Sequence, residues 1–307
     1  MSLVGTSRPD ARPRRVWRRR AAALLATAWL WLDLSSAVPV RAEVGAPEVD
    51  GARAPSTSAV VVLPTVLITP PAHPLDGIPA SELGCRVLRA PSSVGAASLG
   101  APNRGALFNG EQLVTGARWV VESPENAWVT PESARALRRA VEAVHQEHPG
   151  APPLHLGDAS REHGGYLRPH RSHQAGRDVD VGFFYRDGPG WYLPATAENL
   201  DRARTWSLLR ALLATGEVEY VFLDQGVQAL LAEHAAAAGE DPGWLAELFG
   251  GAARSTAPIR HTWGHRTHLH VRFLSPDAVE TGLRLAPHLS PWNGRPTVPP
   301  WRCRPAG

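Results

Sequence analysis

Residues 170–185 read HRSHQAGRDVDVGFFY and contain the clearest strand pattern of the chain. From Arg177 onward, polar and apolar side chains alternate as on a β-strand with one face toward the core. The apolar face carries Val179, Val181 and Phe183. Asp178 and Asp180 share the other face, where burial is costly unless a cation or a hydrogen-bond donor meets them. His173, upstream on a glycine-containing turn, can fold back to the same point.

A second histidine-rich stretch, residues 261–273, reads HTWGHRTHLHVRF. Its last six residues also alternate, so His268 and His270 share one face of a second predicted strand, and Leu269 and Val271 share the other. Seven of the 13 histidines lie in two short windows: His163, His170, His173, His261, His265, His268 and His270. This clustering indicates one shared site.

Imidazole nitrogens and carboxylate oxygens are ligands that zinc prefers, and three protein ligands with one open position are typical of catalytic zinc. Of the paired histidines on the second strand, one can bind the metal while its neighbour stands beside the metal's water as a general base. Either motif alone also fits a polar strand surface, but together they predict a metal site. His163 and His261 are expected in loops, and Asp178 as a hydrogen-bonding partner of a loop or an arginine.

The first 42 residues predict a signal peptide. An arginine cluster precedes an apolar run at residues 21–32, and small residues end at Ala37 and Ala42, the two expected cleavage sites. The apolar run is shorter than the ~20 residues that cross a bilayer, so no stable membrane anchor is expected after cleavage. Export to the periplasm or cell envelope follows.

The charge balance argues against nucleic acid as a partner. Eight arginines and two aspartates in residues 1–42 contribute +6 to a formal net charge of +3, so the rest of the chain carries −3. Nucleic-acid binding requires a concentrated basic face on the folded domain. The predicted mature chain has no such excess.

Composition divides the chain into three parts: the signal peptide at 1–42, a Pro/Ala-rich spacer at 43–82 and one folded domain at 83–307. Thr130 and Pro131 predict a helix start, with a hydroxyl N-cap and proline at the first helical position. Further helices are expected at about 201–214 and 229–238, with a buried strand at 220–223. This pattern predicts an α+β fold, in which an antiparallel sheet carries the metal site and helices flank it.

Cys85 and Cys303 are the only two cysteines and stand at opposite ends of the predicted domain. In an oxidising compartment they could pair, and otherwise they would remain two free thiols.

The segments SHQAGRDVD at 172–180 and WGHRTHLHVR at 263–272 resemble the penicillin-insensitive murein endopeptidases. These zinc peptidases belong to a wider group with lysostaphin-type peptidases, D-Ala-D-Ala metallopeptidases and the hedgehog signalling domain. The resemblance extends over about residues 85–275. It implies that the partner is peptidoglycan. The implied reaction is hydrolysis of the amide between D-alanine and meso-diaminopimelate in its cross-links, and β-lactams would not inhibit it.

Residue by residue, the resemblance implies one Zn²⁺ per chain, held by His173, Asp180 and His270. His268 would be the catalytic base or transition-state stabiliser, and His265 would help to hold the oxyanion or support the site. His170 would be an extra ligand or a substrate contact. The family's end-to-end disulfide would correspond to Cys85–Cys303, and no counterpart of a second, peripheral zinc site is found.

Two alternatives remain. The related D-Ala-D-Ala peptidases usually carry an acid three residues before the last metal histidine, where this chain has Thr267. This favours the endopeptidase over a zinc D,D-carboxypeptidase or dipeptidase that trims stem peptides. A catalytically silent zinc-binding recognition domain, as in hedgehog proteins, is the other alternative.

Overall fold

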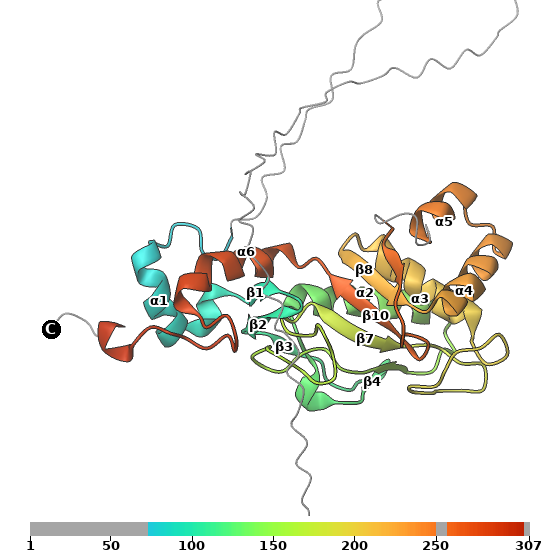
Figure 1. Cartoon of the computed structure of the whole chain (residues 1–307), viewed down its shortest axis with the longest axis horizontal. Coiled ribbons are helices and arrows are strands. Elements are labelled where there is room, and N and C mark those ends of the chain that lie inside the picture. The colour runs from blue at the N-terminus through green and yellow to red at the C-terminus, as the bar shows by residue number, and fades with distance from the viewer. Residues whose placement is uncertain (1–72, 250–256, 304–307) are drawn as a thin grey trace, which may run out of the picture. The chain divides into compact units, whose positions relative to one another are not determined.

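A six-stranded β-sheet forms the centre of the fold in the computed structural model, which describes residues 73–249 and 257–303 (Figure 1). In spatial order its strands are β4 (Trp119–Val121), β6 (Leu154–Leu156), β7 (Asp178–Gly182), β10 (His268–Phe273), β8 (Val218–Leu223) and β9 (Ile259–His261). The four central strands are antiparallel, whereas β4 and β9 run parallel to their neighbours. The predicted α+β class is confirmed, but the sheet is mixed at its edges. Helical crossovers between β4 and β6 and between β8 and β9 account for the parallel pairs.

The predicted alternation on β7 and β10 is present. Val179, Val181, Leu269 and Val271 are fully buried in the main hydrophobic core, which residues of the neighbouring helices complete. Asp178, Asp180, His268 and His270 are also buried, on the opposite face of the two strands. Figure 1 shows β7 and β10 side by side near the middle of the sheet.

The helices begin where side chains satisfy their first backbone N–H groups. In α2 (Pro131–Glu147) the Thr130 hydroxyl accepts from the Ser133 N–H, as the sequence predicts. Helix α3 (Arg202–Ala214) matches its expected bounds. Helix α4 (Gln225–Ala237) begins earlier than expected because Asp224 caps it, and α5 (Pro242–Leu248) follows. Strand β8 is only half-buried, because Val221 and Leu223 face the core while its other residues do not.

A smaller hydrophobic cluster lies among β1 (Ala97–Ala101), β2 (Arg104–Phe108), α1 (Ala80–Arg89) and α6 (Pro276–Leu285). Leu75 is buried in this cluster, and Asp76 accepts a hydrogen bond from Arg284 at 2.8 Å. Residues 73–82, which composition alone places in the spacer, therefore pack as part of the folded domain. The remaining short strands, β3 (Glu111–Gln112) and β5 (Trp128–Val129), pair with each other.

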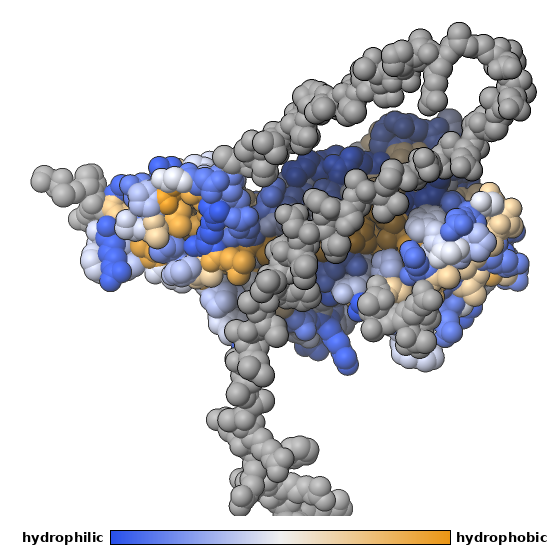
Figure 2. All heavy atoms as spheres, turned by 90° about the horizontal axis from the view of Figure 1, so that it is seen from above, coloured by the Kyte–Doolittle hydropathy of each residue, from blue (hydrophilic) through white to orange (hydrophobic). Residues whose placement is uncertain are grey.

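The ends of the domain are joined covalently. Cys85 in α1 and Cys303 form a disulfide with a Cα–Cα distance of 5.3 Å. The predicted signal peptide and most of the predicted spacer lie outside the described residues. Within the described ranges, no helix combines the length and apolar character needed to cross a membrane. Figure 2 shows hydrophilic residues over much of the visible surface, with smaller hydrophobic patches between them.

Candidate metal centre

Strand pairing brings the two predicted motifs together. The register of β7 and β10 places His270 directly opposite Asp180, and Arg272 opposite Asp178. Side chains opposite each other in an antiparallel pair project from the same face. Residues 90 positions apart in sequence therefore share one side of the sheet.

His173 reaches the same point from the turn before β7. Its backbone has a φ of +64°, a left-handed conformation that non-glycine residues seldom adopt, and its side chain is fully buried. The backbone N–H donates to Asp178 Oδ2 at 3.3 Å, and ring Nδ1 lies 2.7 Å from the Ala159 carbonyl oxygen. A carbonyl only accepts, so Nδ1 carries the proton. The strained turn thus directs ring Nε2 to Asp180, whose Oδ1 lies 3.3 Å away.

His270 and His170 are held in the same way. His270 Nε2 donates to Asp178 Oδ1 at 2.8 Å, and its Nδ1 lies 3.8 Å from Asp180 Oδ1. His170 Nε2 donates to Asp158 Oδ2 at 2.9 Å, and its Nδ1 lies 3.8 Å from Asp180 Oδ2. With Nε2 as the donor, Nδ1 is the nitrogen that each ring turns toward Asp180 and can offer as a metal ligand. Metal-binding histidines characteristically donate their other ring N–H to a carboxylate or carbonyl in this way.

These groups converge on a candidate metal site. His173 Nε2 and Asp180 Oδ1 are buried and have no hydrogen-bond partner among the described residues. His268 Nε2 also lies 3.5 Å from Asp180 Oδ1, so four histidine rings direct a nitrogen toward one carboxylate. One proton cannot satisfy so many acceptors, and unpaired buried polar atoms are costly. The donor set, nitrogen and carboxylate oxygen only, fits a zinc ion.

The structure groups the predicted ligands in part. The ligand atoms of His170, His173 and Asp180 all lie within 4.8 Å of one another. His270, a predicted ligand, is absent from this group, but its Nδ1 lies 3.8 Å from Asp180 Oδ1 and its ring centroid lies 4.6 Å from that of His173. His170, predicted as an extra ligand or a substrate contact, therefore lies in the same group as the predicted ligands His173 and Asp180.

Charges in the cluster shift its titration. Burial raises the pKa of Asp180, but the surrounding histidines outweigh burial and hold its pKa well below the ordinary range. Burial lowers the pKa of His173, yet the charge of Asp180 prevails and the pKa is raised. For His268, burial dominates and lowers the pKa to about 4, which leaves a neutral imidazole at neutral pH. A neutral ring is the form in which a general base accepts a proton.

Asp178 orients His270 and Arg272 through hydrogen bonds. It is fully buried and accepts from His270 and from Arg272 Nε, the latter also at 2.8 Å. These partners outweigh the effect of burial and hold the pKa of Asp178 far below its usual value. The sequence expectation that Asp178 is a hydrogen-bonding partner of a loop or an arginine matches this geometry.

The cluster opens into a cavity of about 880 Å³, here called the histidine cavity. His265 lines it with a ring centroid 4.9 Å from that of His268, and its pKa is lowered by burial and by His270. His261, expected in a loop, instead ends strand β9 and lines the same cavity, because β9 pairs with β8. His163 lies in a turn outside the cavity lining, as expected of a loop residue.

Sequence reasoning missed several residues of the histidine cavity, among them Asn103, Arg171, Tyr192 and Phe222. The Tyr192 ring lies nearly parallel to His268, with centroids 5.5 Å apart, and Phe222 contacts His270 edge-on at 5.1 Å. The aromatic pair at 191–192 within a Gly/Pro-rich stretch was a weak signal for Tyr192. Phe222 stands on β8, next to β10, and only the strand order reveals its place.

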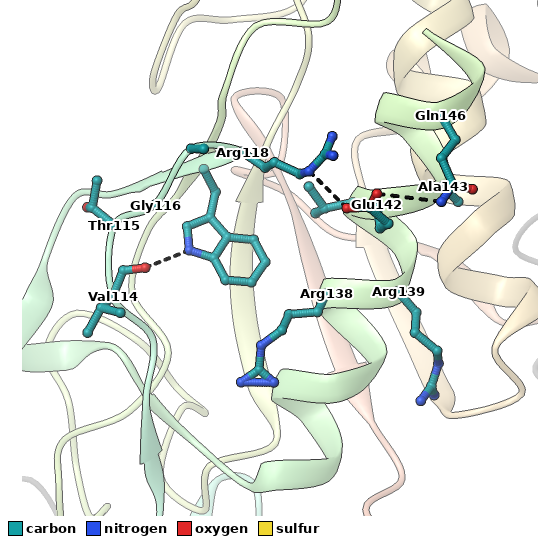
Figure 3. A pocket seen from close by; sticks show the side chains of 12 residues that line it. Val114, Thr115, Gly116, Arg118, Arg138, Arg139, Glu142, Ala143 and Gln146 are labelled. Atoms are coloured by element: carbon teal, nitrogen blue, oxygen red, sulfur yellow. Dashed lines mark hydrogen bonds and ion pairs between the residues drawn. The ribbon is translucent and has the colours of Figure 1, made fainter. Parts of the chain in front are cut away.

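A second cavity, of about 650 Å³, lies between residues 114–119 and α2 (Figure 3). No histidine, aspartate or cysteine lines it, so it lacks the groups that bind zinc. Its three arginines are each paired with a glutamate: Arg118 with Glu142, Arg138 with Glu111, and Arg139 with Glu217. Of these two cavities, the histidine cavity is therefore the one whose side chains could bind zinc.

The model of a protein family described as penicillin-insensitive murein endopeptidase matches residues 98–283, more than half of the chain. The chain belongs to this family. The match covers all of the histidines and aspartates of the metal centre, and it confirms the resemblance that the two motifs indicate. Membership identifies this murein endopeptidase homologue as a peptidase with peptidoglycan as its substrate class. A comparison with curated proteins gives no match.

Proposed function

We propose that the chain is a zinc-dependent endopeptidase that hydrolyses the D-alanyl-meso-diaminopimelyl cross-links of peptidoglycan. The observation that carries this proposal is the convergence of four imidazole nitrogens on the buried carboxylate of Asp180, within 3.8 Å. Family membership supplies the substrate class, and the open histidine cavity gives a peptide access to the cluster.

The proposed zinc ligands are His173, Asp180 and His270, with His170 as a further ligand or a substrate contact. The two strand residues are paired across β7 and β10, and each histidine has its second nitrogen held by an acceptor. Such outer hydrogen bonds fix the ring orientation and raise ligand basicity. Zinc bound there would lower the pKa of a water molecule toward ~7 and polarise the scissile carbonyl.

His268 is the proposed general base. Its ring is neutral at neutral pH, stands beside Asp180, and is covered by Tyr192. In the proposed reaction His268 takes the proton of the attacking water and passes it to the leaving amine. His265, on the same side of the cavity, is proposed to support the site; its Nδ1 donates to the Trp263 carbonyl, which fixes the orientation of its ring.

The endopeptidase is favoured over enzymes that trim stem peptides by the residue before His268. Thr267 replaces the acid of the related D-Ala-D-Ala peptidases, and its hydroxyl bonds His268 Nδ1 at 2.9 Å. The base is therefore positioned by a neutral hydroxyl. The disulfide and the murein substrate fit an exported protein, and we assign it to the periplasm or cell envelope.

Digestion of purified sacculi tests the proposal. The mature chain from Glu43 is incubated with sacculi, with and without a zinc chelator and a β-lactam, and the released muropeptides are separated. Conversion of cross-linked dimers to monomers that the chelator stops and the β-lactam does not is the expected result.

Two other outcomes would redirect the assignment. Trimming of uncross-linked stem peptides with intact dimers would indicate a carboxypeptidase or dipeptidase. Stoichiometric zinc binding without any change in muropeptides would indicate a silent recognition domain. The variant His173→Ala, which should lose both zinc and activity, is the matched control for the site.

A further inference from the structure

The histidine cavity is lined by basic and neutral groups. Among the described residues that line it, none is an aspartate or a glutamate, and two are arginines, Arg171 and Arg272. Arg272 is already compensated, because its Nε donates to the buried carboxylate of Asp178 at 2.8 Å and its guanidinium lies 5.3 Å from the Phe222 ring. The walls of this cavity therefore suit a ligand that carries negative charge.

Arg171 differs from the other arginine. Its side chain is exposed, and no carboxylate of the described chain lies within ion-pair distance of it. In the second cavity, by contrast, each lining arginine is paired with a glutamate, as for Arg118 and Glu142 (Figure 3). An unpaired guanidinium at the rim of a reaction cavity remains available to an anionic ligand.

The backbone of Arg171 is held beside the metal centre. Its neighbour His170 is fixed to Asp158, and His173, two residues on, is fixed to the Ala159 carbonyl and to Asp178. The base of the side chain is thus positioned by the proposed zinc ligands, while the guanidinium stays in solvent. Arg171 lines the same cavity as His268 and His270, so a group that it binds would lie in the cavity where the proposed cleavage takes place.

We propose that Arg171 binds a free carboxylate of the substrate next to the scissile amide and makes the enzyme selective for it. This inference rests on the proposed function. In a D-alanyl-meso-diaminopimelyl cross-link, the carbon that bears the scissile nitrogen also bears a carboxylate. Arginine is always charged and can grip a carboxylate with two parallel hydrogen bonds.

The test compares two cross-linked muropeptide dimers that differ only at this carboxylate, one with the free acid and one with the primary amide. The full chain and its Arg171→Gln variant are assayed on both. Wild type should prefer the acid, and the variant should lose about tenfold in kcat/KM on the acid while its rate on the amide stays the same. Because the carboxylate is present in ground and transition states alike, the loss should appear mainly in KM.

Arg168→Gln is the matched control. Arg168 is an exposed arginine of the same loop that does not line the histidine cavity, so its replacement removes the same charge and should leave both rates unchanged. Arg171→Lys, which keeps the charge without the planar fork, should recover part of the preference. Calorimetric binding of both dimers to the chelator-treated chain gives the same comparison without turnover.

An equal loss on acid and amide in Arg171→Gln, or an unchanged preference for the acid, would overturn the inference while leaving the endopeptidase intact. If wild type cleaved neither dimer, the proposed function itself would be rejected, together with this inference.

Discussion

Replacing Asp178 by asparagine isolates the hydrogen bonds that orient the side chains of the candidate metal centre. Asp178 is fully buried and accepts from the His270 ring, the Arg272 guanidinium and the His173 backbone. Asparagine preserves volume and one acceptor oxygen, but its NH₂ group would face one of these donors. The negative charge opposite Arg272 would also be lost.

The magnitude follows from this burial. Removing one partner of a buried charge pair costs about 3–5 kcal/mol, and the lower end applies because the amide keeps one acceptor. In a domain of this size, about 3 kcal/mol lowers Tm by roughly 6–12 °C. Loss of an outer hydrogen bond to a metal-binding histidine typically weakens metal affinity by about 10- to 100-fold.

Two measurements check Asp178→Asn: thermal unfolding of the chelator-treated chain, and zinc affinity by competition with a chromophoric chelator. Asp158→Asn is the control, because Asp158 is partly exposed and accepts from His170 and Asn126 rather than from His270. We expect smaller losses of Tm and of zinc affinity in Asp158→Asn than in Asp178→Asn. Zinc affinity within about twofold of wild type in Asp178→Asn would refute the idea that this carboxylate orients His270.

Three further predictions follow from the same geometry. His270→Ala should abolish stoichiometric zinc binding, measured by elemental analysis, whereas His170→Ala should weaken zinc binding without abolishing it; the reverse order would assign the third ligand to His170. Because burial lowers the His268 pKa from 6.5 to about 4, the unfolded chain takes up this proton first. Stability of the metal-free chain should therefore fall by about 3 kcal/mol more in wild type than in His268→Asn between pH 6.5 and 4, measured by urea unfolding, and equal pH profiles would contradict this. Replacing Cys85 and Cys303 by serine should lower the free energy of unfolding by about 4–5 kcal/mol, since the bridge closes a loop with a sequence separation of 218; an unchanged urea midpoint would exclude a stabilising role.

Much of the fold could be predicted from local sequence patterns. Alternation at residues 178–183 and 268–273 predicted two strands with their polar faces toward one site, and Thr130 with Pro131 predicted the start of α2. These predictions succeeded because they depend on interactions between residues close in sequence. The start of α4 was predicted too late, because the Asp224 cap sets it. Composition did not indicate that Leu75 packs in a hydrophobic cluster with residues far away in sequence.

The residue types of a possible zinc site can be read from the sequence, because nitrogen and carboxylate donors clustered at strand spacing point to that chemistry. Their arrangement depends on the tertiary structure. The register of β7 with β10 set His270 against Asp180, and Asp158, from a segment before both motifs, fixed the ring of His170. Tertiary structure likewise paired Arg272 with Asp178 and left Arg171 without a carboxylate partner among the described residues. Sequence cannot show such pairings, because they depend on how strands far apart in the chain align, whereas the alternation within each strand is local.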